Sequence, residues 1–102
     1  MRAYNKLVRD RIPEIITAQG EQPIVRTLCR EEFRRELNKK LQEEIAEYLA
    51  SESIEELADI LEVIHSILQS QNKTFLELEE FRLAKKRKRG GFENQIFLKM
   101  VK

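Results

Sequence analysis

The sequence is poor in the residues that restrain a chain covalently or break its helices. Among its 102 residues there is no tryptophan, and there are only three glycines, two prolines and one cysteine. Cys29 alone cannot form an internal disulfide, which is typical of a protein in a reducing cytoplasm. Together with 36% charged and 41% hydrophobic residues, this composition favours a helix-rich globule over a β-sandwich or a disordered tail. The length predicts one domain, residues 1–102.

Long hydrophobic runs are also missing. No apolar stretch approaches the roughly 18 residues that span a bilayer. The first twenty residues carry charges throughout, with none of the apolar core of a signal peptide. We therefore expect a cytoplasmic protein that does not enter a membrane.

The charges nearly cancel, but they are segregated along the chain. The formal net charge is +1, from 19 basic and 18 acidic side chains. Residues 1–30 carry six basic and three acidic side chains, residues 31–80 carry five and 14, and residues 81–102 carry eight and one. An acidic centre between two basic ends produces a local field, and the near-zero total argues against general binding to nucleic acid.

Hydrophobic periodicity and capping residues predict the helices. Pro13 and Gly20 bound a short helix at about 13–19, and apolar residues recur at helical spacing over 30–50 and 54–70. Thr74 to Glu77 fits a capping box that opens a helix ending at Arg89, before Gly90. Residues 24–28 and 95–101 have the composition of short strands. We expect a mainly α fold, an antiparallel helical bundle, with at most a small two-stranded β-ribbon formed by these two segments.

Two neighbouring helices each carry a pair of acids at a spacing of three, which places both members of a pair on one side of a helix. On a helical wheel Glu44 falls inside the apolar stripe of the 30–50 helix, and Glu47 falls at its edge. Glu56 lies inside the apolar arc of the 54–70 helix, with Asp59 just beyond it. Glu43 points away from the stripe and is expected to be solvated.

Carboxylates on a core-facing side are costly unless they are paired or bind a metal. Four oxygen donors from two helices form a site for a hard cation, Mg²⁺ with Mn²⁺ tolerated. Two simpler interpretations compete with this one. Glu56 stands three residues after Ser53, so it could close a capping box, and glutamate-rich helices are most often solvated.

The apolar arc of the 54–70 helix is wider than one packed neighbour requires. We therefore expect a second copy of the chain to cover part of it. The assembly would be a homodimer or a homotetramer in which the helical bundle is completed between subunits.

The acidic pattern resembles that of the MazG-like all-alpha nucleoside triphosphate pyrophosphohydrolases, whose mark is E-E-x-x-E followed by E-x-x-D. Here it reads Glu43-Glu44-Ile45-Ala46-Glu47 and Glu56-Leu57-Ala58-Asp59. The start at 4–13 and the Arg89-Gly90-Gly91-Phe92-Glu93 stretch resemble the small phosphoribosyl-ATP pyrophosphohydrolase-like and house-cleaning branch. Only residues 48–55 separate the two acidic motifs, which is short for the superfamily.

The resemblance implies cleavage of a nucleoside triphosphate between its α- and β-phosphates, giving a nucleoside monophosphate and pyrophosphate. It implies that Glu44, Glu47, Glu56 and Asp59 hold Mg²⁺ and that one carboxylate, Glu44 or Glu47 first, acts on the attacking water. Four cations in or near the family landmarks are the candidates for phosphate binding. They are Lys6, Arg9, Lys85 and Arg89.

Other functions stay open for the basic ends and for the acids. Cations at the end of a helix also favour its dipole, so the 85–89 run has an ordinary structural explanation. The run would serve a nucleic-acid binder too, although no interleaved aromatic residues support that function. A non-catalytic helical binding or assembly protein, in which the acids form structural ion pairs, is the main alternative to an enzyme.

Overall fold

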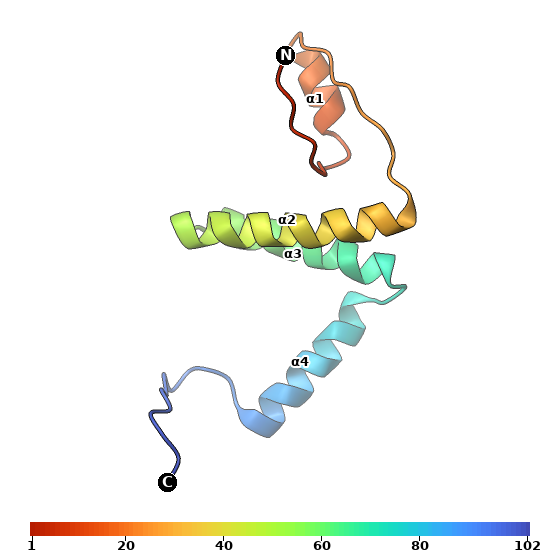
Figure 1. The fold of residues 1–102 in the computed structure, drawn as a ribbon. Coiled ribbons are helices and arrows are strands. Elements are labelled where there is room, and N and C mark those ends of the chain that lie inside the picture. Colours follow the sequence, from red (N-terminus) through yellow and green to blue (C-terminus); the bar gives the residue numbers. More distant parts are fainter. The chain divides into compact units, whose positions relative to one another are not determined.

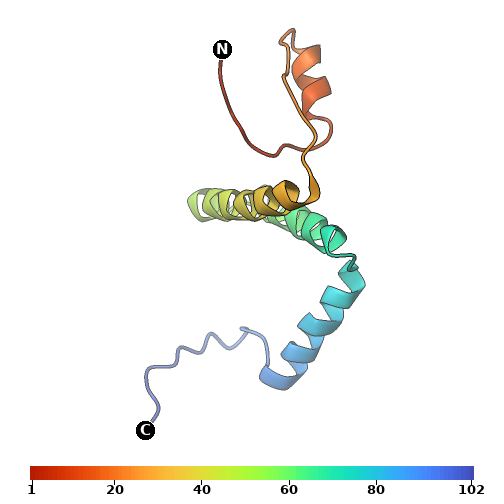
Figure 2. The same cartoon turned by 45° about the vertical axis from the view of Figure 1, so that its right-hand side comes forward.

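The computed structural model describes all 102 residues and contains four α-helices and no β-strand. The chain forms two compact units, Met1–Asn72 and Lys73–Lys102. The first unit holds α1 (Ile12–Ala18), α2 (Arg30–Ser51) and α3 (Ile54–Ser70), and the second holds α4 (Phe75–Arg89) (Figures 1 and 2). The mainly α fold is therefore as predicted, and all four predicted helices form.

The short helix α1 owes its limits to the two residues that predicted it. Pro13 lies in the first turn, where a missing backbone N–H leaves no hydrogen bond unmade. Gly20 follows the helix with a φ of +85°, in the left-handed region that a glycine adopts without strain. The turn before α1 is closed by the Ile12 N–H, which donates to the Arg9 carbonyl at 3.1 Å.

Helices α2 and α3 form an antiparallel hairpin and lie side by side in both ribbon views (Figures 1 and 2). Glu52 makes the sharp reversal with a left-handed φ of 54°, and its N–H donates to the Tyr48 carbonyl. Ser53 is the N-cap of α3, and its hydroxyl accepts a hydrogen bond from the Glu56 N–H at 3.4 Å. The predicted tight turn between the acidic helices is thus present.

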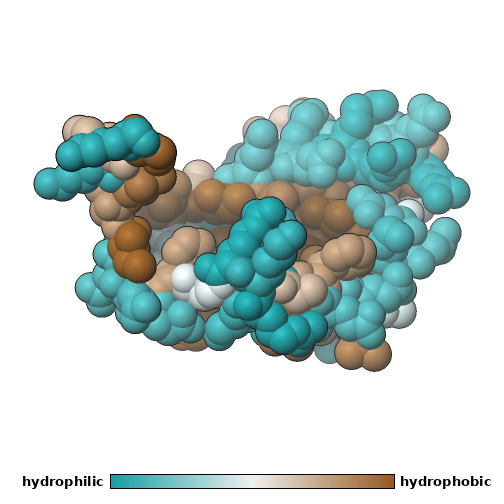
Figure 3. All heavy atoms as spheres, turned by 90° about the horizontal axis from the view of Figure 1, so that it is seen from below, coloured by the Kyte–Doolittle hydropathy of each residue, from teal (hydrophilic) through white to brown (hydrophobic).

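The enclosed apolar core of the hairpin is small. Only Leu37, Val63 and Leu68 are buried, and they lie toward the end of the hairpin away from its turn. Other apolar side chains of α2 and α3 remain largely open, among them Leu49 at 70% exposure and Ile54 at 74%. Figure 3 shows hydrophobic atoms exposed on the face in view, bordered by hydrophilic side chains. The apolar arc of α3 is therefore wider than its contact with α2 covers.

Helix α4 begins with the predicted capping box. The Glu77 N–H donates to the Thr74 hydroxyl, and the Glu77 carboxylate accepts from the Thr74 N–H, both at 3.1 Å. The last turn is basic and ends at Gly90, whose φ is +81° and whose N–H donates to the Lys86 carbonyl. These cations therefore lie at the negative end of the helix dipole, as their structural interpretation predicts.

The predicted β-ribbon is wrong. Residues 24–28 and 95–101 have no regular secondary structure, and neither segment exchanges ladder hydrogen bonds with another extended segment. Alternating or β-branched residues give a segment the tendency to extend, but a strand needs a partner for its backbone groups. The composition of five to seven residues does not show whether such a partner strand exists, so it could not predict a β-ribbon.

Replacing the N-cap Ser53 by alanine should destabilise the hairpin. Ser53→Ala removes the hydroxyl that accepts the Glu56 N–H, so we expect the free energy of unfolding in urea to fall by about 1 kcal/mol. Ser66→Ala makes the same chemical change inside α3 and should be neutral or slightly stabilising, because alanine is the better helix former. Equal effects of the two substitutions would contradict the capping role.

Candidate metal centre

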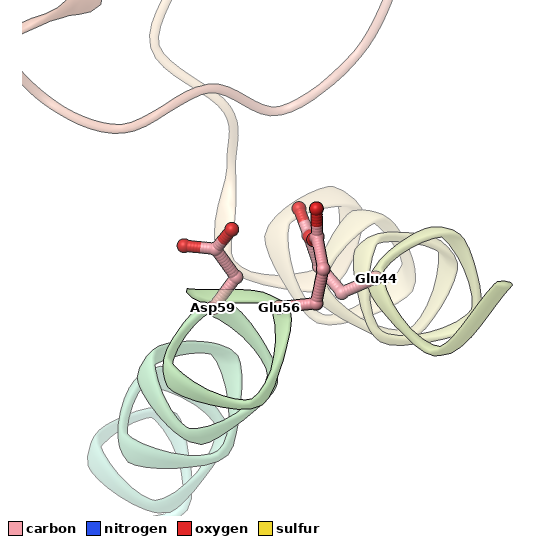
Figure 4. Close-up of side chains that lie close together, drawn as sticks. All are labelled: Glu44, Glu56 and Asp59. Atoms are coloured by element: carbon pink, nitrogen blue, oxygen red, sulfur yellow. The ribbon is translucent and has the colours of Figure 1, made fainter. Parts of the chain in front are cut away.

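Three of the four predicted metal ligands come together near the turn of the hairpin. Glu44 projects from α2, while Glu56 and Asp59 project from the first two turns of α3 (Figure 4). One carboxylate oxygen from each residue can be chosen so that the three atoms lie within 4.8 Å of one another. We call Glu44, Glu56 and Asp59 the acid cluster.

Glu44 is the centre of this cluster and is only 7% exposed. Its Oε2 atom and the Oε2 atom of Glu56 are buried and have no hydrogen-bond partner. Burial disfavours the ionised form and raises the pKa of Glu44 above its ordinary value of 4.5. A shared hydrogen bond with the Glu47 carboxyl and repulsion by Glu47 and Asp59 raise the pKa further, and the Lys40 ammonium opposes them.

Only one cation on these two helices reaches the buried carboxylate. Lys40 Nζ lies 3.5 Å from Glu44 Oε1 and also 3.5 Å from Glu43 Oε1. Its charge is therefore divided between two acids on successive positions of α2. A single shared ammonium does not neutralise the cluster, which leaves a net negative charge in a partly dehydrated site.

Glu56 does not use its carboxylate to close a capping box. The Ser53 N–H donates instead to the Ser51 hydroxyl at 3.3 Å, so only the serine half of the motif is formed. Thr74 and Glu77 complete both halves of the same motif at the start of α4. The Glu56 carboxylate therefore lies in the acid cluster, and the interpretation of Glu56 as the second half of a capping box is wrong.

Two acids of α2 lie elsewhere than the helical wheel predicted. Glu47 is exposed and stands outside the group of three, although it is close enough to raise the pKa of Glu44. Glu43, expected to be solvated, is half-buried and pairs with Lys40 and with Lys6, whose Nζ is 3.6 Å away. The wheel places a side chain by its Cα direction, whereas long side chains bend toward neighbouring charges.

The predicted phosphate contacts of the N-terminal segment lie beside these acids. Arg9 Nη2 donates to Asp59 Oδ1 at 2.7 Å across fifty positions of sequence, and Lys6 pairs with Glu43. The three acids point toward the N-terminal segment, which crosses over them in Figure 4. No local spacing indicates either pair. The only advance signal is the charge segregation between the basic end and the acidic centre.

The other two predicted phosphate contacts, Lys85 and Arg89, lie in the second unit. They line an open cleft of about 860 Å³ at the end of α4, together with Arg82, Lys86 and Phe92. Lys86 pairs with Glu93 at 3.2 Å, and Arg82 pairs with Glu79. Lys85 and Arg89 have no such carboxylate partner, so their side chains stay available to an anion, and their role in phosphate binding stays a prediction.

The residues of the acid cluster fit a divalent cation. All the donors are carboxylate oxygens, which are the ligands that Mg²⁺ and Mn²⁺ prefer. Two of these oxygens are buried without a partner, and such groups in a folded protein require an explanation. A bound cation would supply the missing partner and remove the repulsion that raises the Glu44 pKa.

Comparisons with known proteins leave the family open. No family model matches the chain, and no solved structure matches it. A 48-residue segment, 47% of this chain, is 50% identical to an uncharacterized protein from Mycolicibacterium smegmatis. The match spans about half, 49%, of that relative's length. No helix of the structure has the length and apolar character needed to cross a membrane.

The raised pKa of Glu44 makes the stability of the metal-free protein depend on pH. Because the folded protein favours the protonated carboxyl, this contribution to stability is complete below about pH 4.5 and is lost as the pH rises through the folded-state pKa. Glu44→Gln carries no titrating group at this position. With EDTA present, we expect its free energy of unfolding, relative to that of the wild type, to increase from pH 4 to pH 8.

Urea unfolding at several pH values measures this difference. Glu62→Gln, which removes an exposed negative charge from α3, controls for the change in net charge. A difference between Glu44→Gln and the wild type that stays constant with pH would contradict the burial of an ionisable carboxyl in the cluster.

Proposed function

We propose that this chain is a Mg²⁺-dependent nucleoside triphosphate pyrophosphohydrolase of the MazG-like type. It would cleave between the α- and β-phosphates and release a nucleoside monophosphate and pyrophosphate, with a house-cleaning or phosphoribosyl-ATP-like nucleotide as substrate. The observation that carries the proposal is the pair of buried, unpartnered oxygens of Glu44 and Glu56, which converge from two helices. The free thiol of Cys29 fits a cytoplasmic enzyme.

The acid cluster would hold the metal through Glu44, Glu56 and Asp59, with the buried oxygens of Glu44 and Glu56 among the ligand atoms. When bound, the divalent cation neutralises phosphate oxygens and lowers the pKa of water. Phosphoryl transfer depends mainly on positioning and on charge stabilisation, so rigid ligands on two packed helices suit it. The hairpin turn fixes their spacing, because Ser53 caps the helix that carries both α3 ligands.

Glu47 suits the role of proton acceptor better than the other acids. It is exposed and stands outside the group of three, so its carboxylate is accessible to a water molecule at the edge of the site. It lies next to the cluster, since its carboxyl is close enough to raise the pKa of Glu44. A general base must lie within hydrogen-bond reach of the water that it activates, which favours a carboxylate next to the metal ligands.

The non-catalytic alternative has its own observation. The ion pairs of Lys40 with Glu44 and of Arg9 with Asp59 would also occur in an assembly protein whose acids are purely structural. The two functions differ in their response to metal. A ligand that binds only the folded state raises the melting temperature, so Mg²⁺ should stabilise the enzyme and leave the assembly protein unchanged.

Catalysis is tested by incubating a panel of nucleotides with Mg²⁺ and measuring release of monophosphate and pyrophosphate. We expect activity that EDTA abolishes, a loss of about a hundredfold or more in Glu47→Gln, and a similar loss in Glu56→Gln. Only Glu56→Gln should also lose the rise in melting temperature with Mg²⁺. Glu55→Gln, one position away and exposed, is the matched control and should behave as the wild type.

Inactivity of the wild type on every nucleotide would refute the proposal. An unchanged rate in Glu47→Gln would refute the role given to that residue.

We also propose that the active form is a homodimer or homotetramer. Three buried apolar side chains are too few to offset the conformational entropy of ordering two long helices. Leu57 and Leu61 are nearly half exposed on α3, and Ile54 is more so. A second copy that presents the same face would bury both arcs at once in a helical bundle.

Light scattering coupled to gel filtration tests the assembly. We expect the wild type to have the mass of a dimer or tetramer, and Leu57→Gln to shift the population toward the monomer because it removes apolar area from the contact. Glu55→Gln on the opposite side of the helix should leave the mass unchanged. A monomeric wild type at the highest soluble concentration would contradict the prediction.

A further inference from the structure

The ion pair between Arg9 and Asp59 uses only a small part of what the arginine offers. Arg9 Nη2 donates to Asp59 Oδ1 at 2.7 Å, and no other hydrogen bond of the side chain is formed. A guanidinium carries five N–H donors in a rigid plane, so its other donors remain unused. The Arg9 side chain is 57% exposed and that of Asp59 is 37% exposed. The free edge of the guanidinium is therefore accessible from solvent.

The backbone holds Arg9 at this place independently of its side chain. Its carbonyl accepts from the Ile12 N–H in the turn that leads into α1. Arg11, the N-cap residue of α1, pairs with Glu14 of that helix at 3.0 Å and has no ion pair with the acid cluster. The two arginines thus have equal charge and nearly the same location, but only Arg9 contacts the acid cluster.

Charge balance at the site calls for a cation that can serve two anions. Without Arg9, a divalent cation and Lys40 together would still leave the cluster and Glu47 with net negative charge, and a triphosphate would then approach a site of its own sign. Lys40 is already divided between Glu43 and Glu44, and Lys6 is paired with Glu43. Among the three cations that contact acids of this region, Arg9 alone combines a bond to a cluster ligand with several unused donors.

We infer that Arg9 bridges the metal centre and the substrate: one edge of its guanidinium holds Asp59, and the other edge binds a non-bridging oxygen of the polyphosphate chain. This inference rests on the proposed function. The bond to Oδ1 orients the Asp59 carboxylate and leaves its second oxygen to the metal, as partners of metal ligands commonly do. A planar fork can hold two oxyanions at a fixed separation, which an ammonium group cannot do.

If Arg9 has this bridging role, substitutions at position 9 change the affinity for metal and the affinity for phosphate by different factors. A purely structural ion pair would not produce this difference. Lysine at position 9 can keep the contact with Asp59 as a point charge, but it lacks the second edge. Alanine loses both functions. Arg9 is therefore a positioning residue toward the metal and a direct ligand toward the phosphate.

The test measures metal binding and phosphate binding separately in Arg9→Lys, Arg9→Ala and the matched control Arg11→Ala. Metal binding is followed by electron paramagnetic resonance of free Mn²⁺. Phosphate binding is followed by calorimetric titration with the magnesium complex of inorganic tripolyphosphate, which contains no base. Circular dichroism verifies that each variant is folded, and Arg9→Lys keeps the test valid if the alanine variant does not fold.

We expect Arg9→Ala to bind Mn²⁺ about two- to fivefold more weakly and tripolyphosphate at least tenfold more weakly. Arg9→Lys should bind Mn²⁺ within about twofold of the wild type but should lose roughly fivefold or more in tripolyphosphate affinity. Arg11→Ala should match the wild type in both titrations. This pattern would support the bridging role.

Three results would overturn the inference. Tighter Mn²⁺ binding in Arg9→Ala would show that the arginine competes with the metal, and wild-type tripolyphosphate affinity in Arg9→Lys would show that a point charge suffices. Unchanged affinities with a lowered melting temperature would show a structural tether. A wild type that binds no Mn²⁺ would instead overturn the proposed function together with this inference, and the Mn²⁺ titration of the wild type distinguishes that case.

Discussion

Burying an ionisable carboxyl among other carboxyls is the constraint on which the hairpin depends. Glu44 is almost fully enclosed, its pKa is raised by that burial and by its acidic neighbours, and one of its oxygens has no partner. Burying such a group lowers the free energy of unfolding, so other interactions in the surrounding structure must hold it in place. The packed helices and the capped start of α3 supply that structure, and Lys40, which is shared with Glu43, offsets only part of the charge.

The features that could be predicted from the sequence are those determined within a few residues. Pro13, Ser53 and Thr74 start helices through local backbone hydrogen bonds or fixed dihedral angles, and each of these helix starts was predicted within a residue. The inward position of Glu44 and Glu56 follows from helical periodicity, which is equally local. The acids were recognisable because polar residues on an apolar face contradict the pattern around them.

What could not be predicted depends on partners far along the chain. Residues 24–28 and 95–101 have strand-like composition without strand partners, so their pattern was misleading. The pair of Arg9 with Asp59 spans fifty positions, and no spacing rule connects the two. Glu43 departed from the wheel because its flexible side chain reaches Lys6 and Lys40, which a projection of Cα directions omits.

The length of the turn between α2 and α3 also determines which side of α3 faces α2. Each residue added to a helix rotates everything beyond it by about 100° and advances it by about 1.5 Å. One extra residue inside α3 before Glu56 would therefore swing both α3 acids away from Glu44 together, and it would turn Val63 and Leu68 out of the core with them. A longer hairpin could preserve the cluster only if residues were added to both α2 and α3. Each addition would have to make up nearly whole helical turns. The number of residues between Glu47 and Glu56, the eight positions 48–55, thus determines how the acids of the two helices face each other, although none of the eight is a ligand.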